Sequence, residues 1–166
     1  MDVVSATSGV FAVVSLAIQL AGTIDDVSRF LRNIRGAPAE LASLCKALDQ
    51  MRMTLDQAHC LLEQQFLVLR LPGSPESIAY ALGNCKKGIK GLEDFLRDLK
   101  KSLDRRHRVS RVWASFRMVS KKEDIQHLQN QLRDATTNLQ CAMISNSWQL
   151  QYPILFPVWD AVTADS

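Results

Sequence analysis

The stretch VVSATSGVFAVVSLAIQLAGTI, residues 3–24, decides the fold because it is long, apolar and free of charged side chains. Its small and uncharged polar residues recur every three or four positions, the period of a helix, and so form one narrow stripe. The members of this polar stripe are Ser5, Ser8, Ala12, Ser15, Gln19 and Gly22. A helix that is apolar on its other faces is either the centre of a bundle or a membrane segment. For the resting protein we expect the centre of a bundle.

The same segment is long enough to enter a bilayer. As a helix, residues 3–24 would be about 33 Å long, against about 30 Å for the hydrocarbon core of a membrane. A secretory signal peptide is not expected, since Asp2 precedes the apolar stretch and no basic residue does. A buried helix without charges transfers into lipid at little cost, so a resting place in a bundle and later insertion are compatible.

Helical periodicity continues beyond this segment. Apolar residues recur every three or four positions in four further stretches: 41–69, 78–103, 109–119 and 125–142. Gly36 and Pro38 suit the end of one helix and the first turn of the next, and residues 71–75 contain two prolines and a glycine. Ser120 and Glu123 have the spacing of a capping box before the last stretch. Glycines in 78–103 either weaken that helix or allow close backbone approach.

Composition agrees with a helical domain. The chain has 166 residues, of which 47% are apolar and 22% are charged, and it contains only 7 Gly and 5 Pro. This is an ordinary globular composition, and a chain of this length needs neither disulfides nor a metal to fold. Short connections between long helices predict antiparallel neighbours. We therefore predict an all-α, up-down bundle of four to five helices over residues 1–148, followed by an irregular aromatic and proline-containing tail, 149–166.

Residues that carry catalysis or bind metals in other proteins do not form a recognisable site here. The four cysteines lie far apart from one another, and so do the three histidines: Cys45, Cys60, Cys85 and Cys141, and His59, His107 and His127. A zinc site would need closer ligand pairs, so the cysteines are expected to be reduced thiols on apolar helix faces. The nucleotide-binding and hydrolase motifs GxGxxG, GxxxxGK[ST] and GxSxG are also missing from the sequence. We expect no enzyme, no cofactor and no metal.

The basic residues are unevenly distributed. Residues 97–122 hold ten Lys or Arg against two acids, whereas the net charge of the whole chain is only +3. The ten are Arg97, Lys100, Lys101, Arg105, Arg106, Arg108, Arg111, Arg117, Lys121 and Lys122. A solvated helix face with local ion pairs explains them most simply, and docking on anionic lipid is the next interpretation. Nucleic acid is third, because Trp113 and Phe116 share a helix face with valines and so belong to the core.

Several short motifs, in this order, resemble a known family. They are MDVVSA at 1–6 with the uncharged segment to Gly22, RGAPAEL at 35–41, GIKGL at 88–92, VWASFR at 112–117 and KKEDI at 121–125. Together, over about 1–148, they resemble the fungal HeLo-like N-terminal domain of STAND (NACHT-type) proteins. The chain itself has no P-loop, and the tail lies outside the resemblance.

The resemblance implies a helical bundle related to HeLo domains and, more distantly, to the executioner bundles of necroptosis and of plant resistance proteins. In such proteins a sensor region oligomerises, and the first helix of the N-terminal domain then inserts into a membrane. Carried over to this sequence, the inserting residues are Val3, Val4, Val10, Phe11, Val13, Val14, Leu16, Ile18 and Leu20. The basic segment 97–122 would be the docking face for anionic lipid or a partner.

We therefore expect a non-enzymatic cell-death or incompatibility module that acts by self-association and membrane insertion. Its expected partners are anionic lipid on activation and a STAND sensor region or partner protein, with no nucleic acid. We expect it in the cytoplasm, with recruitment to the plasma membrane on activation. The alternative is a protein–protein adaptor whose first helix never leaves the core.

Overall fold

The computed structural model describes residues 3–33, 39–65, 76–104 and 122–155, and the side chains of 9–33, 39–65, 76–98 and 123–147. These residues form four helices: α1 (Val3–Arg32), α2 (Ala39–Glu63), α3 (Glu76–Asp104) and α5 (Lys122–Leu155). The described ranges contain no strand, so the predicted all-α bundle is confirmed. The helix predicted at 109–119, the capping box and most of the tail lie outside the described residues.

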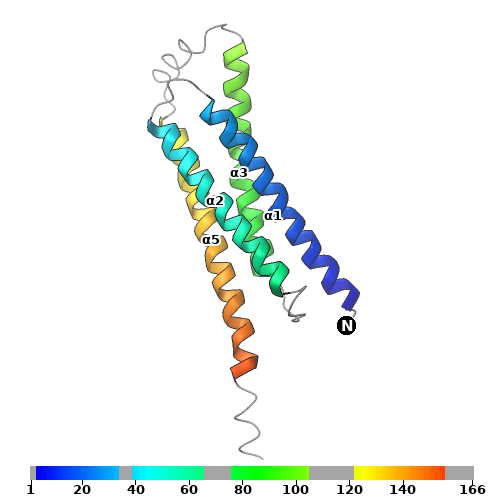
Figure 1. Cartoon of the computed structure of the whole chain (residues 1–166). Coiled ribbons are helices and arrows are strands. Elements are labelled where there is room, and N and C mark those ends of the chain that lie inside the picture. The colour runs from blue at the N-terminus through cyan, green and yellow to red at the C-terminus, as the bar shows by residue number, and fades with distance from the viewer. Residues whose placement is uncertain (1–2, 34–38, 66–75, 105–121, 156–166) are drawn as a thin grey trace, which may run out of the picture.

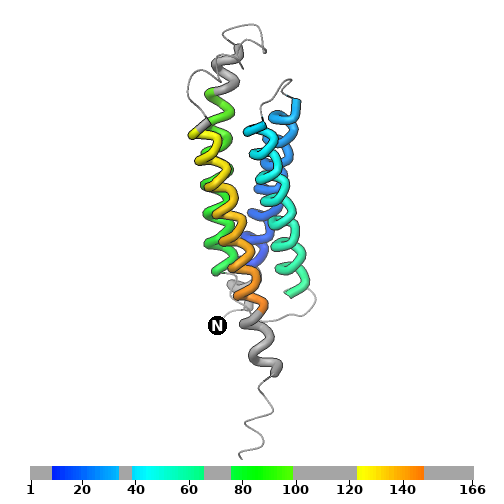
Figure 2. The backbone as a smooth tube through the Cα atoms, turned by 90° about the vertical axis from the view of Figure 1, so that its left-hand side faces the viewer, coloured from blue at the N-terminus to red at the C-terminus, as the bar shows by residue number. Residues whose placement is uncertain are grey.

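The four helices form an elongated bundle in which α1 packs on α2 and α3, and α5 packs on α2 and α3. Figures 1 and 2 show that the direction alternates along the chain, with α1 and α3 running one way and α2 and α5 the other. The order around the bundle is therefore α1, α2, α5, α3. The short connections predicted antiparallel neighbours, but α2 and α3 lie on a diagonal and α2 has the parallel helix α5 beside it.

One continuous apolar core fills the bundle. The predicted seam of α2 is confirmed as far as Leu62, and its last part, 66–69, lies outside the described residues. The seam residues that are described are at most 1% exposed: Leu41, Leu44, Leu48, Met51, Leu55, Ala58 and Leu62. The seam of α3 is buried in the same way from Ile78 to Leu92, and that of α5 from Ile125 to Leu139. α5 continues to Leu155, so the prediction of an irregular tail is wrong for residues 149–155. The domain boundary at residue 148 stays a prediction.

The glycines of α3 divide into two kinds. A Cβ at Gly88 would lie 3.6 Å from Leu132 Cδ2, and one at Gly91 would lie 3.5 Å from Leu128 Cδ2, so these glycines bring α3 close to α5. A Cβ at Gly83 would have no neighbour within 4 Å. Close backbone approach is thus confirmed at Gly88 and Gly91, and weakening of the helix at Gly83 stays a prediction.

Gly83→Ala is expected to stabilise the bundle by about 1 kcal/mol, because alanine is the better helix former and the added methyl group meets open space. Urea unfolding followed by circular dichroism measures this change. A loss of stability would show that the surface beside Gly83 is occupied in solution.

Candidate functional site

α1 occupies a corner of the bundle and not its centre, so the central position expected from its composition is wrong. Of the residues predicted to insert, Val10, Val13 and Leu20 are buried, whereas Phe11 is 56% and Ile18 is 52% exposed. Val14 and Leu16 are half-buried, and the side chains of Val3 and Val4 lie outside the described residues. The helix therefore buries one face and leaves its other face in solvent.

The exposed face of α1 carries the polar stripe. Ala12, Ser15, Gln19 and Gly22 are all exposed, and Gln19 Nε2 donates a hydrogen bond to Ser15 Oγ at 3.2 Å. Asp25 is the first charge after residue 2, so this outer face is uncharged over 9–24. Solvated helix faces are normally rich in charge. An uncharged outer face therefore points to a surface that is covered at some stage of function.

The stretch Gly9–Arg32 is long and apolar enough to cross a membrane. Its most apolar 18 residues have a mean hydropathy of 1.6, and 33% of these residues are buried in the bundle. Core helices of soluble proteins and N-terminal signal sequences meet the same criterion of length and composition. What distinguishes α1 is the combination of this hydropathy with an outer face that is exposed and uncharged.

Two ion pairs join the C-terminal third of α1 to α2. Arg32 Nη2 lies 2.5 Å from Asp49 Oδ1, and Arg52 Nη1 lies 2.6 Å from Asp25 Oδ1. Both pairs are half-exposed, so each contributes about 0–1 kcal/mol. Within the described part of α1, no side chain of 9–24 makes a hydrogen bond or ion pair to another helix. That region is held by apolar contacts alone.

The apolar contacts also change along α1. In the N-terminal part the buried side chains are small or medium-sized: Val10, Val13, Ala17, Leu20 and Ala21. In the C-terminal part Ile24 and Leu31 are each only 1% exposed and belong to the largest fully buried side chains. Local opening is easiest where the fewest interactions hold a segment. Residues 9–21 bury five apolar side chains but make no hydrogen bond or ion pair to another helix, so we expect this part of α1 to open before its last turns.

Polar side chains join α2 to α5, and sequence reasoning did not find them. The pairs are Ser43–Gln129 at 2.7 Å, Thr54–Gln140 at 3.4 Å and Gln65–Asn146 at 2.7 Å. Gln65 and Asn146 are 5% and 4% exposed, so their amides satisfy each other in the interior. The eleven-residue spacing of Ser43, Thr54 and Gln65, three helical turns, was the available signal. These bonds fix the register of the two parallel helices.

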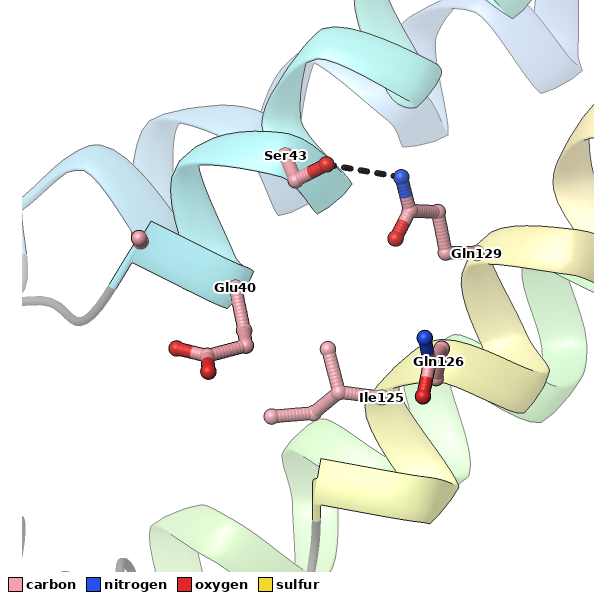
Figure 3. A pocket seen from close by; sticks show the side chains of 6 residues that line it. Glu40, Ser43, Ile125, Gln126 and Gln129 are labelled. Atoms are coloured by element: carbon pink, nitrogen blue, oxygen red, sulfur yellow. Dashed lines mark hydrogen bonds between the residues drawn. The ribbon is translucent and has the colours of Figure 1, made fainter.

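A shallow hollow lies where α2 and α5 begin, with a volume of about 300 Å³ (Figure 3). It is lined by Ala39, Glu40, Ser43, Ile125, Gln126 and Gln129. Figure 3 shows the Ser43–Gln129 bond spanning the gap between the two helices. The described residues contain no group of three or more His, Cys, Asp or Glu that could hold a metal ion. The hollow is thus a polar recess whose side chains do not form a recognisable catalytic site.

Of the predicted basic docking residues, the structure describes the side chain of Arg97, which is exposed and lies 2.9 Å from Asp94 Oδ1. The other nine fall on side chains outside the described residues, and their role stays a prediction. The sequence analysis missed three exposed lysines of α3, Lys86, Lys87 and Lys90. Their signal was the KKxxK spacing, which was hidden inside an apolar seam.

Comparison with family models matches residues 7–139 to SesA, an N-terminal domain on NACHT NTPases and P-loop NTPases. The matched range covers most of α1, all of α2 and α3, and more than half of α5. The searches of curated proteins and of solved structures returned no match.

Proposed function

Because the chain belongs to the SesA family of N-terminal domains on NACHT and P-loop NTPases, we propose that it is a non-enzymatic effector module that acts by releasing α1 into a membrane. Clustering by a STAND sensor region frees the N-terminal part of α1, which then enters the bilayer and triggers fungal-type cell death or incompatibility. The resting protein is cytoplasmic, and activation recruits it to the plasma membrane. The observation that carries the proposal is the exposed, uncharged outer face of α1.

The free-energy cost of placing residues 9–24 in lipid is low. Residues 9–24 carry no charge, and the backbone of a helix satisfies its own hydrogen bonds in lipid. The buried valines and Leu20 exchange apolar protein contacts for apolar lipid. Asp25 and Arg32 mark the end of the transferable part, since charged side chains are costly in lipid and both of these pair with α2.

The second candidate function is a protein–protein adaptor, and one observation favours it. Phe11 and Ile18 are seven residues apart, lie on one face of α1 and are both more than half exposed. Such a ridge fits the groove of a partner protein, as amphipathic helices do elsewhere. In this case α1 stays on the bundle, and a charge placed outside the ridge has no effect on vesicles.

Ser15→Asp tests the proposal, with Thr137→Asp on the exposed face of α5 as its matched control. Ser15 is exposed near the middle of residues 3–24, and an aspartate there can still accept the hydrogen bond from Gln19. Both variants should fold as the parent does, to within about 0.5 kcal/mol. A charge near the centre of a membrane helix costs about 3 kcal/mol, so Ser15→Asp should slow dye release roughly 100-fold.

The measurement is dye release from phosphatidylcholine–phosphatidylserine vesicles by the biotinylated chain clustered on streptavidin. Thr137→Asp should release dye at the parental rate. Equal release by Ser15→Asp would show that α1 does not enter lipid. If the clustered parent releases no dye at all, the membrane mechanism is wrong and the adaptor function stands.

A further inference from the structure

Three lysines on α3 form a basic cluster without partners. Lys86, Lys87 and Lys90 are exposed, and none of them makes an ion pair with any residue that the structure describes. α3 carries no acidic residue between Glu76 and Glu93. Like charges four positions apart on a helix repel one another. None of the three lysines is neutralised by an ion pair in the described part of the bundle, which leaves the cluster available to an external anion.

Lys86 and Lys90 face away from α5 and toward the α1 side of the bundle. Gly88 is the residue of α3 that approaches Leu132 of α5. Residues two positions apart on a helix are about 200° apart around its axis, so Lys86 and Lys90 both lie nearly opposite Gly88. Because the order around the bundle is α1, α2, α5, α3, the outer surface opposite α5 is the one that α3 shares with α1.

α1 contributes uncharged residues to this same surface. Asp25 pairs with α2. Thr23 is two positions away and therefore lies on the opposite side of α1, the side that borders α3. The residues that share this side of α1 with Thr23, three or four positions apart, are Gln19, Leu16 and Ala12. The α1/α2 face, in contrast, carries both acidic and basic side chains, which are joined in ion pairs. The α1/α3 face, defined by residues 9–24 and 77–92, thus has lysines as its only charged residues.

We propose that the α1/α3 face docks on an anionic lipid surface, with Lys86, Lys87 and Lys90 contacting the phosphate oxygens of the headgroups. This inference rests on the proposed function, because docking there brings the uncharged part of α1 against the bilayer before it is released. A lipid surface fits better than a nucleic acid. The uncharged strip of α1 beside the lysines would meet no phosphate on a duplex, whereas it can rest on the apolar boundary of a membrane.

The test is the double variant Lys86→Glu with Lys90→Glu, compared with Lys46→Glu plus Arg133→Glu. The control pair changes the net charge by the same amount, and both residues are exposed and make no ion pair in the described structure. Lys46 and Arg133 lie one turn from Ser43 and Gln129, which join α2 to α5, so they mark the opposite face of the bundle. Circular dichroism should show equal folding for both variants.

Sedimentation with phosphatidylcholine vesicles, with and without phosphatidylserine, measures docking. We expect the parent and the control pair to bind only the anionic vesicles, and the α3 pair to bind them about 30-fold more weakly. If both double variants lose vesicle binding equally, net charge alone explains the effect. If the α3 variant loses no binding, the three lysines take no part in docking. Salt-sensitive binding to duplex RNA in place of vesicles would assign the cluster to nucleic acid. Each of these three results overturns the proposal.

Tethering the chain to the vesicle distinguishes a failure of this inference from a failure of the proposed function. Nickel-chelating lipid recruits a histidine-tagged chain without any need for lysines. The clustered α3 pair should then release dye as the parent does. If the parent docks through the lysines but never releases dye, the inference stands and the membrane mechanism fails. If the tethered α3 pair remains inactive while the parent is active, the lysines act after docking and the inference is wrong.

Discussion

A chain that lacks residues 2–22 is expected to lose the cooperative unfolding transition of the bundle. The deletion removes five buried side chains, Val10, Val13, Ala17, Leu20 and Ala21, each at most 8% exposed. Burial of valine and leucine side chains contributes about 1.5–3 kcal/mol each, and alanine less, so the loss is roughly 6–8 kcal/mol. Single domains are stable by only about 5–15 kcal/mol. The deletion is therefore expected to remove most of the free energy of unfolding of the bundle.

The antiparallel course of α1 and α2 determines where the damage falls. Residues 10–21 lie along the second half of α2, where Leu55, Ala58 and Leu62 are 0% exposed in the intact bundle. Without α1 these side chains would face water, and the shortened chain should bind a hydrophobic dye and aggregate. Urea unfolding followed by circular dichroism, together with size-exclusion chromatography, measures this outcome.

A sharp transition near the parental midpoint would contradict this prediction. It would mean that the N-terminal part of α1 contributes almost nothing to the fold and leaves the bundle freely. The expected instability also decides how the membrane mechanism must be tested. Loss of vesicle lysis in the deletion would follow from misfolding alone, so a substitution that keeps the fold, such as Ser15→Asp, is required.

Much of the fold could be predicted from sequence because buried faces repeat at helical spacing. In α2, leucines and Met51 follow each other every three or four residues, and the structure buries them all. Such a pattern needs only local geometry, since a helix with one apolar stripe has one way to hide it. The same reasoning succeeded for α3 and α5.

The arrangement of the helices could not be predicted in the same way. The break at residues 66–75 is short, which suggested that α2 and α3 are neighbours. Ten extended residues reach about 33 Å, however, which is ample for a diagonal crossing. Helical spacing says which face is buried and not which helix covers it. The polar pairs between α2 and α5 arise from this choice of neighbours, so single-chain periodicity gave no reason to pair Gln65 with Asn146.

The corner position of α1 was misjudged for a related reason. A helix that is apolar nearly all round was expected to be surrounded by other helices. The structure instead leaves Phe11 and Ile18 more than half exposed and buries the small residues Ala17 and Ala21. Hydropathy counts apolar residues without saying which of them touch protein. The exposed remainder is what makes α1 a candidate for function, and composition alone could not separate it from the buried part.

Alkaline pH should destabilise the bundle through Cys85. This thiol is 0% exposed in the core, and burial raises its pKa from 9.0 to about 11. Its Sγ donates a weak hydrogen bond to the Ala135 carbonyl oxygen at 3.7 Å, which requires the protonated form. The unfolded chain ionises near pH 9, whereas the folded chain keeps its proton until about pH 11. Stability is therefore fully present below pH 9 and falls as the pH rises from 9 to 11.

The size of this fall follows from the shift in pKa. About 2 pH units correspond to roughly 2.7 kcal/mol of lost unfolding free energy, a large share of the stability of a small domain. Urea midpoints measured at pH 8, 9, 10 and 11 test it, with Cys85→Ala as the control. The alanine variant starts less stable, because it leaves a small cavity between α3 and α5, but it lacks the ionising thiol. Its stability should decline less steeply above pH 9 than that of the parent. Parallel declines would show that Cys85 ionises as easily in the folded chain as in the unfolded one.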